Sequence, residues 1–233
     1  MVSELDLHYP SESCPFCNIA QAYPEPQPEP SRKGDSASAS SKSLLWSPPS
    51  PTRETRTYQE EEKREESSLQ SCVPRDDGDV GSANPDRTSP ASFVVLASQE
   101  VVAFLDILPM VGGHLLVATR HHRVKVADMK DDEGREMGFW LPILSRVVAK
   151  VTGVQDYNIV QNNGARAAQV VPHVHFHIIP RPGTMPEIKS KSWAMFGRGQ
   201  RDELDDDEGA KLAAEMRSVL REEIEKMGRR PRL

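Results

Sequence analysis

Short apolar runs bounded by turn residues recur between residues 93 and 181, a pattern typical of β-strands. Four of them cover residues 93–96, 101–105, 114–118 and 157–161. A fifth stretch, residues 172–181 with the sequence PHVHFHIIPR, alternates strictly between histidine and apolar residues. The pattern predicts a sheet of about five strands.

A helix is predicted between the third and fourth strands. Its apolar residues recur at spacings of three and four, at Met137, Leu141, Leu144, Val148 and Val151. Acidic residues 131–133 suit its start and Gly153 suits its end. Pro142 lies inside it and should kink the helix or split it in two.

A second helix is predicted near the C-terminus. It begins near Asp205–Glu208, and its apolar stripe consists of Leu212, Met216, Val219, Leu220 and Ile224. The elements form hairpins with helices inserted, not alternating βαβ units. This order predicts an α+β fold with a mostly antiparallel sheet, one central helix and a C-terminal helix.

Composition divides the chain into parts. Residues 24–92 hold over half of the 19 prolines, together with serine-rich and glutamate-rich runs and few apolar residues. Such a composition is typical of disorder, so we predict a disordered insertion there. Residues 1–23 are expected to belong to the same domain as the core, residues 93–182, and residues 183–233 form a C-terminal loop and helix.

The formal net charge of −6 argues against a general nucleic-acid surface. The N-terminus lacks the basic and apolar regions of a signal peptide, and no apolar run approaches 18 residues. We therefore expect no membrane partner and a cytoplasmic or nuclear location, or both. Cys14 and Cys17 form a CxxC pair, which is either half of a zinc site or two reduced, buried thiols.

Three of the seven histidines, His173, His175 and His177, occupy alternate positions of the last predicted strand. Alternate residues of a strand point to one face and lie roughly 6–7 Å apart. The three imidazoles can therefore share one phosphate-sized ligand or one metal ion, while the residues between them anchor the strand in the core.

The segment His173–Ile179, HVHFHII, resembles the signature of the histidine triad (HIT) family, in which histidines alternate with apolar residues. Other segments agree with that family in order and spacing, namely CPFC at 14–17, AFLDILP at 103–109, GHLLVATRHH at 113–122 and QNNG at 161–164. The resemblance covers residues 14–22 and 93–182. It implies a compact α+β domain, usually a homodimer, that cleaves nucleoside phosphoramidates or dinucleoside polyphosphates, commonly with adenine.

The resemblance also implies roles for particular residues. His175 would be the nucleophile that forms a nucleotidyl-histidine, with His173 and His177 as its flanking partners. The implied substrate-binding residues are Asp106 for the ribose, Phe104 and Ile107 for the base, and Asn162 and Gln169 for the phosphate region. Val170 stands where many members carry a serine or threonine that assists the leaving group.

Family members with CPFC complete a zinc site with two histidines, and the matching positions here are His122 and His173. With Cys14 and Cys17 they make a Cys₂His₂ set, which is a closed, structural type of zinc site. His121 is the competing candidate.

Two other functions remain open at this point. In one, the three imidazoles hold a catalytic zinc ion in a hydrolase or lyase. In the other, the protein is a non-catalytic scaffold that binds nucleotides. Asp106 and Asn162 also suit ordinary turns, since they precede a proline turn and a glycine.

Overall fold

A five-stranded antiparallel sheet forms the centre of the computed structural model, which describes residues 13–26, 65–77, 82–183 and 203–228. The strands lie in the order β1-β2-β3-β5-β4. Their bounds are Val94–Ala97 (β1), Val101–Leu105 (β2), Leu115–Thr119 (β3), Tyr157–Gln161 (β4) and His175–Pro180 (β5). The predicted α+β fold with an antiparallel sheet is confirmed.

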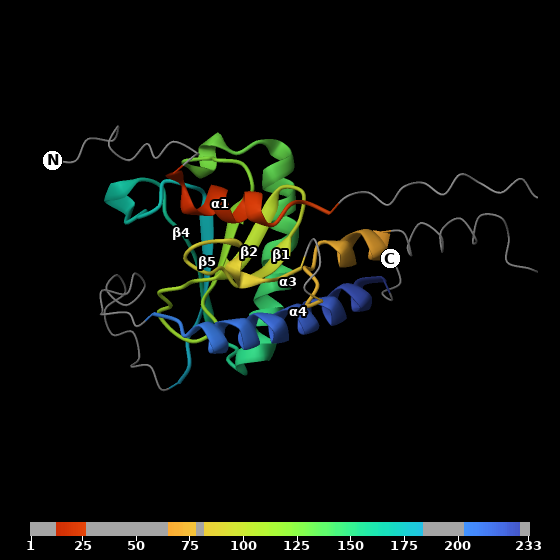
Figure 1. Cartoon of the computed structure of the whole chain (residues 1–233). Helices are drawn as coiled ribbons and strands as arrows, with labels where there is room; N and C mark the ends of the chain where they lie inside the picture. Colours follow the sequence, from red (N-terminus) through yellow and green to blue (C-terminus); the bar gives the residue numbers. More distant parts are fainter. Residues whose placement is uncertain (1–12, 27–64, 78–81, 184–202, 229–233) are drawn as a thin grey trace, which may run out of the picture.

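Each face of the sheet is covered by helices. The helices are α1 (Pro15–Ala22), α3 (Asp131–Thr152) and α4 (Asp206–Gly228). Phe104 and Leu116 point toward α1, whereas Leu105 and Ile178 pack into the core formed with α3 and α4. In Figure 1 the strands accordingly lie between α1, drawn in red, and α4, drawn in blue. Alternation along the strands therefore produces two separate apolar layers.

Helix α3 starts and ends as its sequence predicts. Glu133 accepts a hydrogen bond from the Lys130 backbone N–H at 2.7 Å, which satisfies one free donor of the first turn. Gly153 adopts the left-handed conformation, with φ of 68°, and ends the helix.

The predicted split at Pro142 is wrong, because α3 is continuous from Asp131 to Thr152. Trp140 and Ile143, which flank the proline, are both fully buried in the core. Packing on both sides of Pro142 therefore outweighs the loss of one backbone hydrogen bond.

The disorder predicted for residues 24–92 is wrong for residues 65–77 and 82–92. Residues 65–71 are helical, and Cys72 and Val73 are buried in the core under α4. The Cys72 carbonyl accepts the backbone N–H of Ala97 at 2.8 Å, which ties this segment to β1. Average composition misses such a short apolar pair inside a polar stretch.

Other parts of the predicted insertion and tail cannot be compared. Residues 1–12, 27–64, 78–81, 184–202 and 229–233 lie outside the described residues. They include most of the loop predicted after residue 183.

Helices α3 and α4 are joined by a buried carboxylate. Glu223 of α4 accepts hydrogen bonds from Arg146 at 2.9 Å and Lys150 at 2.5 Å, both on α3, and from Lys226 at 3.3 Å. Burial by itself would raise the pKa of Glu223, but the bonds from these cations outweigh it and lower the pKa to about 2.

Within the described ranges, no helix has the length and apolar character needed to cross a membrane.

Strand β4 pairs only with β5 in the described sheet, and Tyr157 and Ile159 on it are exposed. The expected homodimer and the expected location both stay predictions.

The contact between α4 and the sheet yields a stability prediction. A Cβ added at Gly209 would lie 2.7–2.9 Å from ring atoms of the buried Phe93. We expect Gly209→Ala to destabilise the fold by about 1–3 kcal/mol, since the ring has to shift. Gly138→Ala on α3, where nothing lies within 4 Å of the added Cβ, should instead stabilise by up to about 1 kcal/mol. Urea unfolding of both variants tests this, and equal effects would contradict it.

The Glu223 network yields a pH prediction. Because its pKa is lower in the folded state, ionised Glu223 stabilises the fold above about pH 4.5, and this contribution is lost as the pH falls toward 2. The stability difference between the wild type and Glu223→Gln should therefore be largest above pH 4.5 and shrink toward pH 2. Chemical denaturation across this range measures it, and a constant difference would refute the assignment.

Candidate functional site

The histidine row lies on the face of the sheet that α1 covers. His175 and His177 pair with Ala118 and Leu116 of β3, so their rings point to the same side as those residues. Their ring centroids are 4.9 Å apart. His173 precedes β5, and its ring turns toward α1 and its cysteines. The predicted shared face therefore holds, but the three rings do not converge on one ligand.

The hydrogen bond made by His175 determines which of its nitrogens is available. Nδ1–H donates to the backbone carbonyl of His173 at 2.6 Å, which leaves the lone pair on Nε2. His175 is only 6% exposed, and burial lowers its pKa, although the bond to the carbonyl acts in the opposite direction. His175 is therefore neutral at pH 7, with one unprotonated nitrogen.

His177 is held by a histidine that the sequence interpretation missed. Its Nδ1 lies 3.0 Å from Nε2 of His114, and Nδ1 of His114 lies 3.2 Å from Oδ2 of Asp106. His114 is fully buried just before β3. His114, Leu116 and Ala118 are alternate residues and so point to the same face of the sheet. This alternation in the sequence could have placed His114 beside the histidine row.

A cavity of about 830 Å³ opens beside the histidine row. Its size suits a nucleotide-sized ligand. His175 and His177 line it, and so do four of the predicted substrate-binding residues, Phe104, Asp106, Ile107 and Asn162. Further walls come from α1 and from the segment Arg87–Ser92, neither of which was predicted to contact a substrate.

Gln169 does not line this cavity, in contrast to the predicted role at the phosphate. Its side chain is buried, where Oε1 accepts the Gly164 N–H at 2.6 Å and Nε2 donates to the Val124 carbonyl at 2.7 Å. Nε2 also lies 3.4 Å from the His173 carbonyl, the group that orients His175. Gln169 therefore braces the loop before β5.

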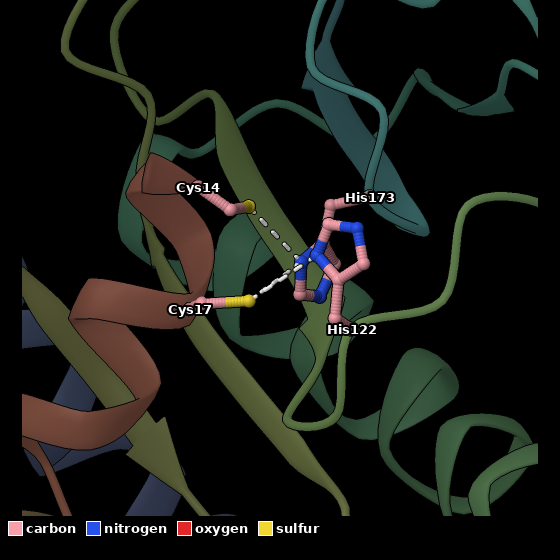
Figure 2. A group of neighbouring side chains, drawn as sticks. All are labelled: Cys14, Cys17, His122 and His173. Carbon is pink, nitrogen blue, oxygen red and sulfur yellow. Dashed lines mark hydrogen bonds between the residues drawn. The ribbon is translucent and has the colours of Figure 1, made fainter. Parts of the chain in front are cut away.

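The two cysteines and two histidines predicted to bind zinc lie together, as Figure 2 shows. Their ligand atoms all lie within 4.8 Å of one another. His173 Nδ1 is 3.3 Å from Cys14 Sγ and 3.5 Å from Cys17 Sγ, and His122 Nδ1 is 3.3 Å from Cys17 Sγ. Zinc ligands at tetrahedral corners are about 3.3–3.8 Å apart, so these spacings fit.

The protonation of His173 also suits a metal ligand. Its Nε2–H donates to the Thr119 carbonyl at 2.7 Å, which leaves the Nδ1 lone pair facing the thiols. Burial lowers the pKa of His173 to about 4, so the ring is neutral at pH 7. Burial also raises the pKa of the Cys17 thiol to about 12, and a metal ion would have to displace this proton.

His121, the competing candidate, lies outside this cluster. Its side chain is 57% exposed, and its Nε2 lies 3.6 Å from Oε2 of Glu100. The set that fits zinc is therefore Cys14, Cys17, His122 and His173.

Comparison with known proteins agrees with this geometry. The HIT domain family model matches residues 87–184. The adenosine 5'-monophosphoramidase of Schizosaccharomyces pombe is 44% identical over 81 residues, which cover 35% of this chain and 58% of that protein. The Saccharomyces cerevisiae enzyme of the same name is 40% identical over 90 residues, 39% of this chain and 54% of that protein.

The match to these two yeast proteins thus spans little more than half of their length. An uncharacterised HIT-like protein of Methanocaldococcus jannaschii is 47% identical over 89 residues, which cover 38% of this chain and 67% of that protein. The family match, these identities and the histidine strand lead to one conclusion: the chain belongs to the histidine triad family.

Proposed function

We propose that the protein is a nucleotide hydrolase or transferase of the histidine triad type. Its substrates would be adenosine phosphoramidates or dinucleoside polyphosphates, and its product the nucleoside monophosphate. Two similar yeast proteins are named adenosine 5'-monophosphoramidases, which supports the phosphoramidate class. The single observation that carries the proposal is the buried His175, with its Nδ1–H donated and its Nε2 unprotonated beside the cavity.

The reaction would proceed in two displacements at phosphorus. Nε2 of His175 attacks the α-phosphorus, the N–P bond forms, and the bond to the leaving amine or phosphate breaks. Water then attacks the nucleotidyl-histidine, the N–P bond breaks, and the monophosphate leaves. Neutral imidazole suits both steps because it is nucleophilic at pH 7 and can later depart.

Neighbouring groups would stabilise the charge that develops on the phosphoryl oxygens. His177 and Asn162 line the same cavity, and His177 is oriented by its contact with His114. Asp106 lines the cavity as well, where its carboxylate can accept hydrogen bonds from ribose hydroxyls. Val170 also lines the cavity, is 83% exposed and carries no hydroxyl. The leaving group would therefore obtain its proton from solvent or from a histidine.

We also propose that the Cys₂His₂ cluster holds a structural zinc ion. Zinc would fix α1 on the sheet through four protein ligands and leave no open position for chemistry. The rival reading, in which the three imidazoles hold a catalytic metal, has less support. The His173 ring faces the cysteines, and Nδ1 of His175 is already hydrogen-bonded.

Removing the nucleophile tests the mechanism. We expect His175→Ala to keep its fold but to retain less than about one tenth of the wild-type kcat on an adenosine phosphoramidate, since the covalent route is lost. Mass spectrometry of quenched wild-type enzyme should locate the adenylyl group on His175. His121→Ala, which removes an exposed imidazole outside the cavity, is the control and should keep its activity. A His175→Ala variant with more than a tenth of wild-type activity would exclude this mechanism, and a wild type without turnover would favour a binding scaffold.

The metal proposal is tested by a pair of cysteine variants. Cys14→Ser should lower both the zinc content, measured by elemental analysis, and the melting temperature, because one of four ligands is lost. Cys72→Ser is the matched control, since Cys72 is buried but its Sγ donates to the Ser68 carbonyl instead. The site would be refuted if purified wild-type protein contained no zinc, or if the two variants contained equal amounts of zinc.

A further inference from the structure

The cavity lies along a row of paired residues on the sheet. Sheet pairing places His177, Leu116, Phe104 and Val94 in one row across β5, β3, β2 and β1. Because neighbouring strands are about 4.8 Å apart, the row extends roughly 14 Å from the histidines to the β1 edge. A nucleotide with its phosphorus at the histidines and its base against Phe104 and Ile107, which line the cavity, would extend along this row toward β1.

Helix α1 runs in the same direction as this row. Its first turn lies at the histidines, where the ring of Phe16 is 5.0 Å from that of His175. Its last turn leads to Tyr23, whose hydroxyl donates to the carbonyls of Ser92 at 3.1 Å and Asn84 at 2.6 Å. Between these two contacts, Asn18 and Ile19 line the same cavity as Phe104 and Ile107, the residues expected to contact the base.

Asn18 is the polar side chain that α1 presents to the cavity. It is exposed and lines the cavity, as do Pro15, three residues before it on the same side of the helix, and the buried Ile19. Among the described residues, no group hydrogen-bonds the Asn18 amide. An amide that lines a cavity without such a partner is available to a ligand.

A second wall is the segment Arg87–Ser92, which faces the same cavity. Thr88 Oγ1 hydrogen-bonds the Pro90 carbonyl at 2.8 Å and contacts Ser92 Oγ at 2.6 Å, so the loop is held by its own side chains. Arg87 ties it to α1 by donating to the Ala22 carbonyl at 3.0 Å. Ser89 is exposed on this braced loop and lines the cavity.

We propose that Asn18 reads the edge of the nucleobase and makes the site selective for adenine, with Ser89 as a second polar contact. This rests on the proposed function, which places a nucleotide in the cavity. The Asn18 amide would accept from the adenine N6 amino group and donate to N7, a bidentate match. Guanine presents acceptors at both O6 and N7, so the amide oxygen would face a lone pair. The Ser89 hydroxyl can donate or accept, so it would add affinity without discriminating.

The test is nucleotide binding by the full-length, zinc-loaded chain. Calorimetry gives the dissociation constants of AMP and GMP for the wild type, for Asn18→Leu and for Gln21→Leu. Leucine has the branched shape of asparagine but neither donor nor acceptor, so it removes the amide's hydrogen bonds, and the same change at Gln21 controls for the added apolar surface. Gln21 is the matched control, because it carries the same amide on the same helix but lines a different, smaller cavity.

We expect the wild type to bind AMP at least about tenfold more tightly than GMP, and Asn18→Leu to reduce that ratio to within threefold. Gln21→Leu should keep the wild-type ratio. Equal binding of AMP and GMP by the wild type, or an unchanged ratio in Asn18→Leu, would overturn the inference. A wild type that binds neither nucleotide would overturn the proposed function as well. A wild type that binds AMP without hydrolysing phosphoramidates would overturn the catalytic proposal alone and leave the ratio to decide the inference.

Discussion

The conformation of His173 is the constraint on which the rest of the site depends. Its ring is held between the Thr119 carbonyl and the two cysteines, while its own carbonyl accepts the Nδ1–H of His175. Gln169 approaches the same carbonyl from the loop side. His173 therefore links the Cys₂His₂ cluster to the tautomer of His175. A shift of its backbone would alter both.

Helix α1 depends on the same arrangement from the other side of the cavity. Seventy-one residues, 23–93, separate α1 from β1 in the sequence, so the chain connection alone does not fix the helix on the sheet. Its position depends on direct contacts with residues that are distant in sequence. Arg120 donates to the Ala20 and Tyr23 carbonyls at 2.6 and 2.9 Å, and Phe16 packs against the ring of Phe104 at 5.2 Å. A zinc ion held by Cys14 and Cys17 would add its bonds at the start of the helix. The same contacts that stabilise α1 thus also keep the cavity wall in place over His175.

Periodicity predicted the strands, both long helices and the face of the histidine row, because these depend on local alternation and burial. It did not predict that residues 65–77 adopt a defined structure. This segment is held by contacts between distant parts of the chain, such as the hydrogen bond that Arg217 of α4 donates to Asp76. Nor could periodicity separate the roles of Gln169 and Asn162, which are close in sequence. Only the turn of the loop decides that Gln169 points inward and Asn162 toward the cavity.

The division of the site between segments has a consequence for specificity. His175, His177 and Asp106 all lie within residues 87–184, the part that the HIT domain model matches. Asn18 lies on α1, outside that part, although α1 forms a wall of the same cavity. The proposed chemistry at phosphorus would need the strand and its hydrogen bonds, whereas the proposed base selection would need only a side chain with the correct donors and acceptors on that wall. If both proposals hold, a substitution at the exposed Asn18 would change which nucleotide is preferred without moving Nε2 of His175.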